Sequence, residues 1–350
     1  MRSLNTVYYE ILNPLHEPDW NDRLSPGMGE SIFNSAEWAA VLHESYGYRP
    51  CYVTSREADT RSLLIPMMEV DSWLTGRRGV SLPFSDFCAP VGVGSENITS
   101  VIQELVSLGR QRNWRYCEIR NDCAVPPEMP RSARYLTHTL DLAPSDAEQF
   151  GRLDGSVRTS IRKAVTSGVE VTFSVSLDSM RDFYKLNCET RRRHGLPPQP
   201  FRFFRNVHQH IIAKGLGRTV TAWHLGRPIA AALFFHAGRQ ALFKYGASDS
   251  ETQHLRAVSL LMWEAIRHYA EAGFERLSMG RTAKTHSGLR RFKLGWGTQE
   301  GELGYVRYDL HAGGFVGEQP SVAADGYRLL RLLPLFVLRW GGAAFYRHMA

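Results

Sequence analysis

Residues 256–279, RAVSLLMWEAIRHYAEAGFERLSM, predict a long helix followed by a strand. Five apolar side chains recur at helical spacing along its first part: Val258, Leu261, Met262, Ile266 and Tyr269. Gly273 is typical of the end of such a helix, and 275–279 has a strand-like composition. Just upstream, 228–236 and 240–247 are strand-like runs joined by a short turn, which predicts a β-hairpin. A hairpin, a long helix and a returning strand indicate an α/β domain.

Helices and strands also alternate in the rest of the chain. Helices are expected over 35–45, 97–109, 158–167, 178–193 and 200–214. Strands are expected over 51–54, 62–68, 116–120, 136–142, 169–174 and 218–224. A short loop at 143–146 separates the two halves. We therefore expect a mixed α/β protein with an N-terminal domain, 1–144, a second domain, 145–310, and a C-terminal tail, 311–350.

The composition is that of an ordinary globular protein. The 350 residues suffice for about two domains, and 43% hydrophobic with 22% charged residues disfavours disordered, collagen-like and multi-span membrane proteins. Five scattered cysteines favour buried thiols in a reducing compartment over a disulfide framework. The net charge of +7 tolerates polyanionic partners, phosphate-bearing substrates above all. Because the sequence shows no apolar leader and no apolar run of about 20 residues, we expect a cytoplasmic protein.

Several common catalytic motifs are missing from the sequence: the nucleophile elbow, the Walker loop, the dinucleotide fingerprint and paired CxxC motifs. Their absence disfavours hydrolase, kinase and dehydrogenase chemistry. His208 and His210 lie two residues apart on an expected helix, so their side chains point to different sides and one metal ion cannot bind both. We expect no metal.

The segments 279–282 and 287–297 have the most unusual composition, because glycines, aromatic residues and cations alternate directly after an expected strand. The glycines allow the backbone to approach a ligand closely. Lys293 follows Phe292, and bulky neighbours that exclude water would let its ammonium stabilise an oxyanion or a phosphate. Alternatively, Phe292 and Trp296 are core residues and Lys293 extends to solvent.

Two arginine clusters are candidate phosphate-binding groups. Arg158 and Arg162 fall at helical spacing on one expected helix. Arg191 and Arg192 end the next expected helix. Alternatively, arginines at the end of a helix complement its dipole and face water.

Asp86 lies in the loop 81–90, SLPFSDFCAP, together with two phenylalanines. This composition is unusual for a solvated connection, so Asp86 is a candidate to bind an amine or a hydroxyl group. Alternatively, Asp86 caps the turn while the phenylalanines pack on the core.

The chain carries a family likeness in four segments. They are RTSIRKAVTSG at 158–168, FYKL at 183–186, the hairpin at 227–247 and, most specifically, Gly280-Arg281 with FKLGWG at 292–297. These segments resemble the GNAT-fold acyltransferases of the Fem and CelD type, and the likeness covers about 33–308. The resemblance implies two tandem N-acyltransferase domains, each a twisted mixed sheet flanked by helices.

The resemblance also implies a reaction. An acceptor amine attacks an activated acyl group, either a thioester or an aminoacyl-tRNA ester, without a metal or a covalent intermediate. Phe292 and Lys293 match a pair that lies in the cleft of Fem-type enzymes, where the lysine positions the donor and stabilises the tetrahedral intermediate. Arg281 and Trp296, in the same motif, become candidates for substrate binding. Asp86, or Glu189 in its place, is a candidate to take the amine proton.

The resemblance leaves two classes of acyl donor open. Acetyltransferases of this fold hold the coenzyme A pyrophosphate on a Gly-rich turn at the start of the central helix. The matching stretch here, SETQHLRAV at 250–258, contains no glycine, and Arg256 is the residue that would add positive charge. The expected donor is acyl-CoA, and the alternative is aminoacyl-tRNA.

The expected acceptor is an amine of a cell-envelope or exopolysaccharide precursor that is linked to a nucleotide or a lipid. With an aminoacyl-tRNA donor, the acceptor would be a peptidoglycan precursor. A third interpretation is a non-catalytic assembly protein that binds a nucleotide-linked glycan.

The C-terminal tail contains a basic amphipathic stretch at 327–347, interrupted by Pro334. Leucines and aromatic residues alternate there with arginines, which is typical of a helix pair that lies on the anionic inner face of a membrane. Alternatively, the tail docks onto the first domain of the same chain.

Overall fold

The computed structural model describes residues 7–22, 24, 31–57, 60–88, 90–92, 98–121, 125–318 and 330–349. Contacts divide the chain into two compact units. Unit 1 comprises Met1–Tyr135, Glu302–Ser321 and Arg347–Ala350, and unit 2 comprises Leu136–Gly301 and Val322–Tyr346.

Two long strands contribute residues to both units. β9 (Ala133–Asp141) begins in unit 1 and ends in unit 2, whereas β15 (Gln299–Asp309) begins in unit 2 and ends in unit 1. The expected boundaries, 144/145 and 310/311, fall just after these strands. The observed division differs from them because a sequence pattern marks where a strand ends, but not the point along the strand at which its contacts change.

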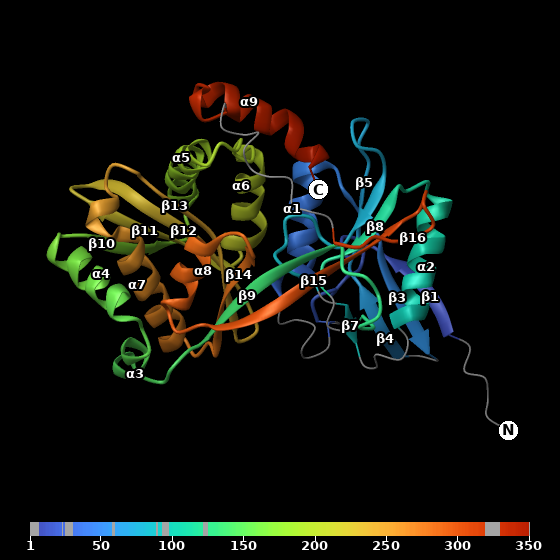
Figure 1. The fold of residues 1–350 in the computed structure, drawn as a ribbon, viewed down its shortest axis with the longest axis horizontal. Helices are drawn as coiled ribbons and strands as arrows, with labels where there is room; N and C mark the ends of the chain where they lie inside the picture. Colours follow the sequence, from blue (N-terminus) through green and yellow to red (C-terminus); the bar gives the residue numbers. More distant parts are fainter. Residues whose placement is uncertain are drawn as a thin grey trace. The chain divides into compact units, whose positions relative to one another are not determined.

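The sheet of unit 2 has the strand order β10 (Glu170–Ser174), β11 (Gly217–His224), β12 (Arg227–Ala237), β13 (Gln240–Ser248), β14 (Arg276–Ala283), β9 and β15 (Figure 1). Strands β10 to β13 pair antiparallel, whereas β13 and β14 run parallel. Ala237 pairs with Gln240, which confirms the predicted hairpin. β12 is buried without interruption over 229–235, as expected for a strand covered on both faces.

Helices cover both faces of this sheet (Figure 1). α7 (Ala257–Glu271) packs on β11 and β12 and against α4 (Gly155–Thr166). α5 (Leu177–Arg193) packs on β12 and β13 and against α6 (Phe201–Val207), which continues as the π-helical η3 (His208–Ile212). α7 confirms the predicted long helix, and the remaining short elements are α3 (Asp146–Gly151), η4 (Gln253–Leu255) and α8 (Ser287–Leu294).

Unit 1 contains two groups of strands. The first has the order β1 (Val7–Leu12), β3 (Tyr52–Glu57), β4 (Thr60–Ile65) and β7 (Val91–Gly92). In the second, β15 is followed by β8 (Tyr116–Ile119), β6 (Arg78–Val80), β5 (Met68–Val70) and β2 (Arg49–Pro50), and β16 (Gly314–Phe315) pairs with β15. The helical elements are η1 (Ile32–Asn34), α1 (Ala36–Tyr46) and α2 (Ile98–Gln111). α1 and α2 match the predicted helices, except that Asn97 lies outside the described residues.

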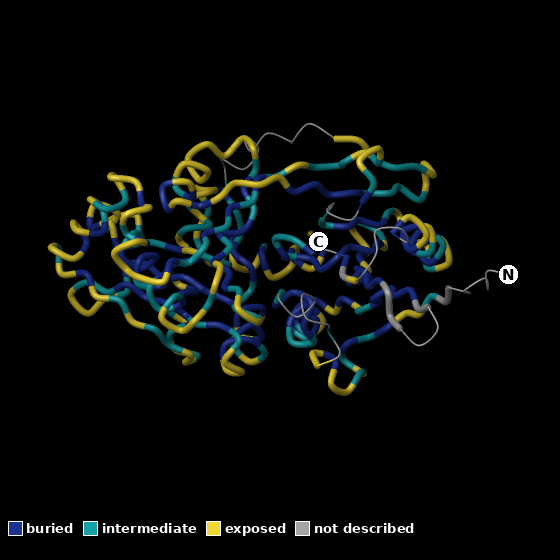
Figure 2. The backbone as a smooth tube through the Cα atoms, turned by 90° about the horizontal axis from the view of Figure 1, so that it is seen from below, coloured by how far each residue is buried: buried dark blue, intermediate teal, exposed yellow. Residues whose placement is uncertain are grey.

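The core of each unit consists of the apolar faces that the sequence pattern predicts. In unit 1, Val101, Ile102 and Leu105 of α2 belong to a core cluster that also contains Cys51 and Cys117. Four cysteines, at 51, 88, 117 and 188, are buried and unpaired, as expected, and Cys123 lies outside the described residues. Figure 2 shows the same distribution along the backbone, with buried strands and exposed connecting loops.

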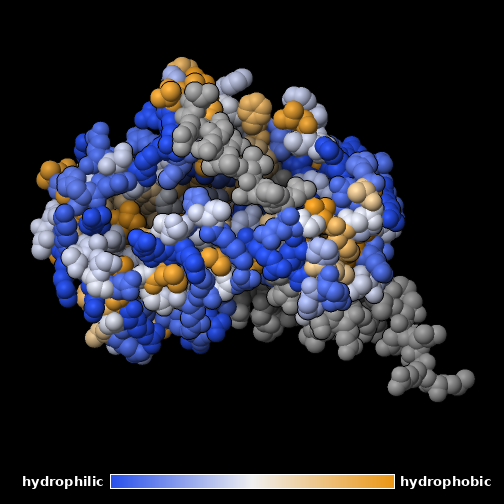
Figure 3. All heavy atoms as spheres, viewed as in Figure 1, coloured by the Kyte–Doolittle hydropathy of each residue, from blue (hydrophilic) through white to orange (hydrophobic). Residues whose placement is uncertain are grey.

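The C-terminal helix α9 (Leu335–Phe345) packs on unit 2 and is followed by η6 (Tyr346–His348). Leu338 and Gly342 are buried on its inner face, whereas Phe336 and Trp340 are each 73% exposed on the other. Figure 3 shows small hydrophobic patches on a surface that is mostly hydrophilic. Docking on the first domain was the alternative expectation for the tail. The last residues of the tail do contact that domain, since Arg78 donates to the backbone carbonyl of His348 at 2.8 Å and the Tyr48 hydroxyl donates to that of Arg347 at 3.1 Å. The helix α9 instead packs on α5 of unit 2, with Gly342 against Pro198. Residues 319–329 of the expected tail lie outside the described part of the chain.

Candidate active site of unit 2

The candidate site lies where β13 leaves β14. The two strands pair over residues 240–242 and 276–278, and the rest of β13 lines a cavity. In an antiparallel pair, alternate residues of a strand point their N–H and C=O groups away from the partner strand. Half of the peptide groups in this part of β13 therefore point away from β12. We call the cavities along this part of β13 and the start of α7 the acyl cleft.

The acyl cleft has an apolar inner cavity of about 290 Å³. The cavity exists because four residues of β12 and β13 in its wall have small side chains or none: Ala231, Ala232, Gly246 and Ala247. The larger side chains of Val258, Leu261 and Phe292 enclose it. A neighbouring cavity of about 250 Å³ shares Ser248, Val258 and Phe292 with it and extends to Arg256. Phe292, a predicted site residue, thus lies between two cavities.

Arg256 lies at the start of α7 in a left-handed conformation, with φ of 59°. This conformation is uncommon for a residue other than glycine. Arg256 adopts it directly before α7, at the position where acetyltransferases of this fold have their glycine-rich turn. The start of α7 therefore presents its first backbone N–H groups beside a guanidinium group, in the place where the resemblance puts a donor phosphate.

A third cavity of about 480 Å³ is polar and shares Arg193 with the inner cavity. Four arginines line it: Arg192, Arg193, Arg227 and Arg331. Three carboxylates, Glu189, Asp249 and Glu251, face them. Among the described residues, none of these arginines forms an ion pair within 4 Å. Arg192 thus lines a cavity whose guanidinium groups form no ion pair with a described residue, and its phosphate-binding role stays a prediction.

The other predicted arginines are placed differently. Arg191 donates to the hydroxyl of Tyr346 at 2.7 Å, so it holds the residue that follows α9 on unit 2. Arg162 lies over the ring of Phe150 at 5.6 Å, and neither it nor Arg158 lines one of the three cavities. Arg281 contributes its backbone carbonyl to the contact described next.

Lys293 is buried at 3% exposure, so the alternative that it extends to solvent is wrong. Its ammonium donates to the carbonyl oxygens of Gly280 at 2.9 Å and Arg281 at 3.1 Å. Gly280 has a φ of +67°, a kink in β14 that glycine adopts without strain. Lys293 therefore fixes a bend in β14 next to the acyl cleft. Trp296 lies fully buried beneath this contact, with its ring edge-on to Phe292, and does not line the cavities.

A buried histidine beside this bend was not identified from the sequence. His138 of β9 is fully buried, with Nε2 3.2 Å from Oε2 of Glu300 and Nδ1 3.5 Å from the hydroxyl of Thr282. Burial, and then the charge of Lys293, lower the pKa of His138. The Arg290 guanidinium binds Glu300 through two bonds of 2.7 Å and lowers the pKa of that carboxyl. The alternation in 136–140, LTHTL, places His138 on an inward face and is the signal that could have revealed it.

His194, at the end of α5, lines the inner cavity. Burial lowers its pKa, and the nearby charges of Arg193 and Arg191 lower it further, so the imidazole is neutral at pH 7. A neutral imidazole can accept a proton. His194 was not identified from the sequence, because it directly follows three arginines and has the same composition signal as they have.

Asp86 lies in unit 1, in the loop between β6 and β7. Its backbone carbonyl accepts a hydrogen bond from the Tyr305 hydroxyl at 3.0 Å. The two phenylalanines of the loop pack on aromatic neighbours, Phe84 against Tyr46 and Phe87 against Phe33, as the structural alternative expected. Asp86 does not line any of the three cavities of unit 2, and its predicted role as a proton acceptor stays a prediction.

Residues 152–298, the stretch that contains the acyl cleft, match the family model described as an acetyltransferase (GNAT) domain. Among solved structures, FemX is similar with a TM-score of 0.63 and 12% identity, covering 85% of this chain and 96% of that chain. The C-terminal domain of a putative lysylphosphatidylglycerol synthetase from Agrobacterium fabrum is 15% identical with a TM-score of 0.56, covering 89% and 94%. A tandem GNAT protein from the clavulanic acid biosynthesis pathway is 11% identical with a TM-score of 0.55, covering 87% and 99%. No curated protein matches the chain in sequence.

These comparisons confirm the GNAT domain and the resemblance to Fem-type proteins at the level of the fold, which is mixed α/β as expected. The same comparisons support an acyltransferase activity for this chain. Within the described ranges, no helix is both long and apolar enough to cross a membrane. The described side chains also include no group of three or more metal-ligating residues placed to hold an ion.

Proposed function

We propose that unit 2 transfers an acyl group from acyl-CoA to an amine. The observation that carries this proposal is the acyl cleft, in which an apolar cavity of about 290 Å³ adjoins an arginine-lined cavity of about 480 Å³ through Arg193. An acyl donor of this kind has one apolar end and one phosphate-rich end. The apolar cavity suits the acyl end, and Arg256 of the neighbouring cavity together with the arginines of the polar cavity offers guanidinium groups to phosphates.

The donor would place its acyl chain against Ala231, Ala247 and Leu261, and its phosphates near Arg256 and the start of α7. N–H groups of β13 that point away from β12 would donate to the thioester carbonyl and to the oxyanion that forms from it. Arg192 and the other arginines of the polar cavity would bind further phosphate groups, of the donor or of the acceptor.

We assign Lys293 a positioning role. Its ammonium already donates to two carbonyl groups, so it acts on the reaction by holding the bend of β14 beside Phe292. The reaction then needs a neutral amine aligned with the carbonyl carbon, and alignment with oxyanion stabilisation supplies most of the acceleration. His194 is our preferred proton acceptor, because it lines the inner cavity and is neutral at pH 7.

For the acceptor, we propose an amine of a cell-envelope or exopolysaccharide precursor that is linked to a nucleotide or a lipid. The mixed charge of the polar cavity supports this class, since arginines bind phosphate while Glu189 and Glu251 attract an amine. The reaction would take place in the cytoplasm. The exposed aromatic residues Phe336 and Trp340 of α9 support a peripheral contact with the anionic inner face of the membrane.

A second candidate is aminoacyl transfer from aminoacyl-tRNA to a peptidoglycan precursor. It is favoured by the structural likeness to FemX and to a putative lysylphosphatidylglycerol synthetase, and by the absence of a glycine-rich turn before α7. A tRNA donor predicts affinity that falls steeply with salt, because several phosphates are neutralised at once. A non-catalytic assembly protein is the remaining alternative, and it predicts binding without turnover.

The test is calorimetric titration of acetyl-CoA into the wild-type protein and into a Val258→Trp variant, which fills the junction of the two cavities. We expect binding by the wild type and its loss in the variant, with Ala272→Trp, on the exposed end of α7, as the matched control. Release of free coenzyme A that depends on an added amine then measures turnover. Absence of heat with acetyl-CoA and of any amine-dependent release would refute the acyl-CoA proposal.

A further inference from the structure

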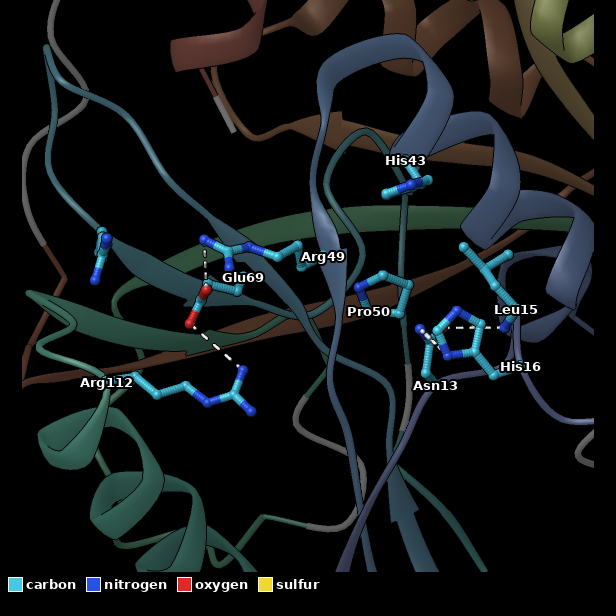
Figure 4. A pocket seen from close by; sticks show the side chains of 9 residues that line it. Asn13, Leu15, His16, His43, Arg49, Pro50, Glu69 and Arg112 are labelled. Carbon is cyan, nitrogen blue, oxygen red and sulfur yellow. Dashed lines mark hydrogen bonds and ion pairs between the residues drawn. The ribbon is translucent and has the colours of Figure 1, made fainter.

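Unit 1 contains a cavity of about 600 Å³ that has no part in the proposed acyl transfer (Figure 4). Three arginines from separate parts of the unit line it: Arg49 on β2, Arg77 just before β6 and Arg112 just after α2. Their side chains are 58%, 50% and 35% exposed, in that order, so a dissolved ligand can reach them. Three guanidinium groups around one cavity are typical of a binding site for an anion.

These guanidinium groups are only partly engaged within the protein. Arg49 uses one nitrogen, at 3.4 Å from both Glu69 and Asp71. Arg77 uses Nε, at 3.0 Å from Asp71, and Arg112 uses Nη1, at 3.5 Å from Glu69. Each group thus keeps most of its five N–H donors for other partners. Three cations share two carboxylates, which leaves the cluster with a net positive charge.

Glu69 is a buried carboxylate that holds two of the three arginines in place. Its carboxylate is only 6% exposed and accepts a hydrogen bond of 2.8 Å from the indole N–H of the buried Trp114. Figure 4 shows the side chains of Arg49 and Arg112 converging on Glu69 from two different elements. A carboxylate held in this way orients two arginines before a ligand arrives, which reduces the entropy cost of binding.

The rest of the wall suits the organic part of a ligand. Leu15 and Pro50 supply apolar surface, and Figure 4 shows them apart from the arginine pair, next to His16. The side-chain amide of Asn13 donates to Nδ1 of His16 at 3.4 Å, so in the neutral ring the proton lies on Nε2, a further donor. A cavity of about 600 Å³ is also much larger than an inorganic phosphate, which is comparable in size to a few water molecules of about 30 Å³.

We infer that unit 1 binds a phosphate-bearing organic molecule of nucleotide or sugar-phosphate size in this cavity. The phosphate contacts Arg49, Arg77 and Arg112, and the organic part lies against Leu15, His16 and Pro50. The site is independent of the acyl cleft, because all of its residues belong to unit 1. The inference therefore stands or falls separately from the proposed acyl transfer.

The experiment is calorimetric titration of the full-length protein at low ionic strength with AMP, inorganic phosphate and adenosine. We expect AMP to bind more tightly than phosphate, and adenosine to bind at least tenfold more weakly than AMP, since the guanidinium groups recognise the charge. Arg77→Gln is expected to weaken AMP binding about tenfold, because a charge-assisted hydrogen bond is lost. Among the residues that the structure describes, the Arg77 side chain pairs only with the half-exposed Asp71, so this variant is expected to keep its fold. Arg112→Gln is the second variant.

Two further variants separate this site from other sources of binding. Arg239→Gln, at an exposed ion pair of unit 2, is the matched control and is expected to behave as the wild type. Arg192→Gln alters the polar cavity of the acyl cleft, and it identifies any part of the AMP binding that belongs to that cavity. The inference is overturned by no binding of AMP or phosphate, by equal affinity for adenosine and AMP, by unchanged affinity in both Arg77→Gln and Arg112→Gln, or by a loss confined to Arg192→Gln.

Discussion

The inner cavity of the acyl cleft predicts how donor affinity depends on acyl chain length. At about 30 Å³ for each water-sized group, its 290 Å³ holds about ten such groups, far more than an acetyl group supplies. Each added methylene that enters an apolar cavity contributes about 0.8 kcal/mol, or about fourfold in Kd. In the wild type, octanoyl-CoA is therefore expected to bind about 15-fold more tightly than hexanoyl-CoA, because both chains fit.

The perturbation is Ala247→Leu, which adds three carbon atoms to the wall of the cavity. Three groups of about 30 Å³ remove roughly a third of the space, which leaves room for about seven groups. A hexanoyl group, with six carbon atoms, still fits, whereas the eighth carbon of an octanoyl group does not. The 15-fold step between these two donors should therefore fall to about fourfold in the variant, while affinity for acetyl-CoA stays close to that of the wild type.

The assay is calorimetric titration of acetyl-, hexanoyl- and octanoyl-CoA into both proteins, with thermal melting to confirm that the variant folds. Ala272→Leu, an exposed position just after α7, is the control and should keep the wild-type series. A flat series in the wild type would refute the assignment of the cavity to the acyl chain. So would a full 15-fold step that persists in Ala247→Leu.

Three further predictions follow from charge and packing. If His194 takes the amine proton, kcat of the wild type should fall at a pH below the ordinary histidine pKa of about 6.5, because the imidazole then gains a proton. His194→Asn should lose most of its turnover and also this fall of kcat at low pH, and an unchanged pH profile excludes the role. Burial lowers the pKa of His138 in the fold below its ordinary value of 6.5. Just below pH 6.5 the unfolded chain therefore binds more protons than the folded chain, and stability rises with pH in that range. Urea unfolding between pH 5 and 8 should show a shallower rise in His138→Gln, by up to about 1.4 kcal/mol per pH unit, and equal slopes would contradict it. Gly342→Ala should detach α9, because a Cβ there would overlap the carbonyl oxygen of Pro198. Faster chymotrypsin cleavage at Phe336 and Trp340 measures the detachment, with Gly341→Ala as the control, and equal cleavage of the two variants contradicts the packing.

The sequence predicts the scaffold of unit 2 well because its signals are local. Five apolar residues at helical spacing and Gly273 define α7, and a short turn between two strand-like runs defines the β12–β13 hairpin. Phe292 was singled out because an aromatic residue between glycines and cations is unusual, and it lines both apolar cavities, while its role at the site stays a prediction.

What the sequence could not predict depends on contacts between distant segments. Lys293 reads as a cation for a ligand, but two carbonyl groups of β14, twelve and thirteen residues away, take its hydrogen bonds. The arginine-lined cavity of unit 1 joins residues that are scattered from Asn13 to Arg112, none of which stands in a motif. Arg191 and Arg192 are neighbours with the same composition signal, yet one holds Tyr346 and the other lines a cavity, because successive residues on a helix point in different directions.

The strands shared by the two units also set the order in which the protein can fold as it is synthesised. Glu118 of β8 is buried with two arginines, and its pKa is lowered by Arg120 and Arg307 despite burial that acts in the opposite direction. Arg307 lies 189 residues further along the chain, on β15. Domains usually fold from the N-terminus as they emerge from the ribosome. In this chain, unit 1 cannot complete its fold before almost the whole of unit 2 has been synthesised. Until then, the carboxylate of Glu118 lacks Arg307, one of its two cations.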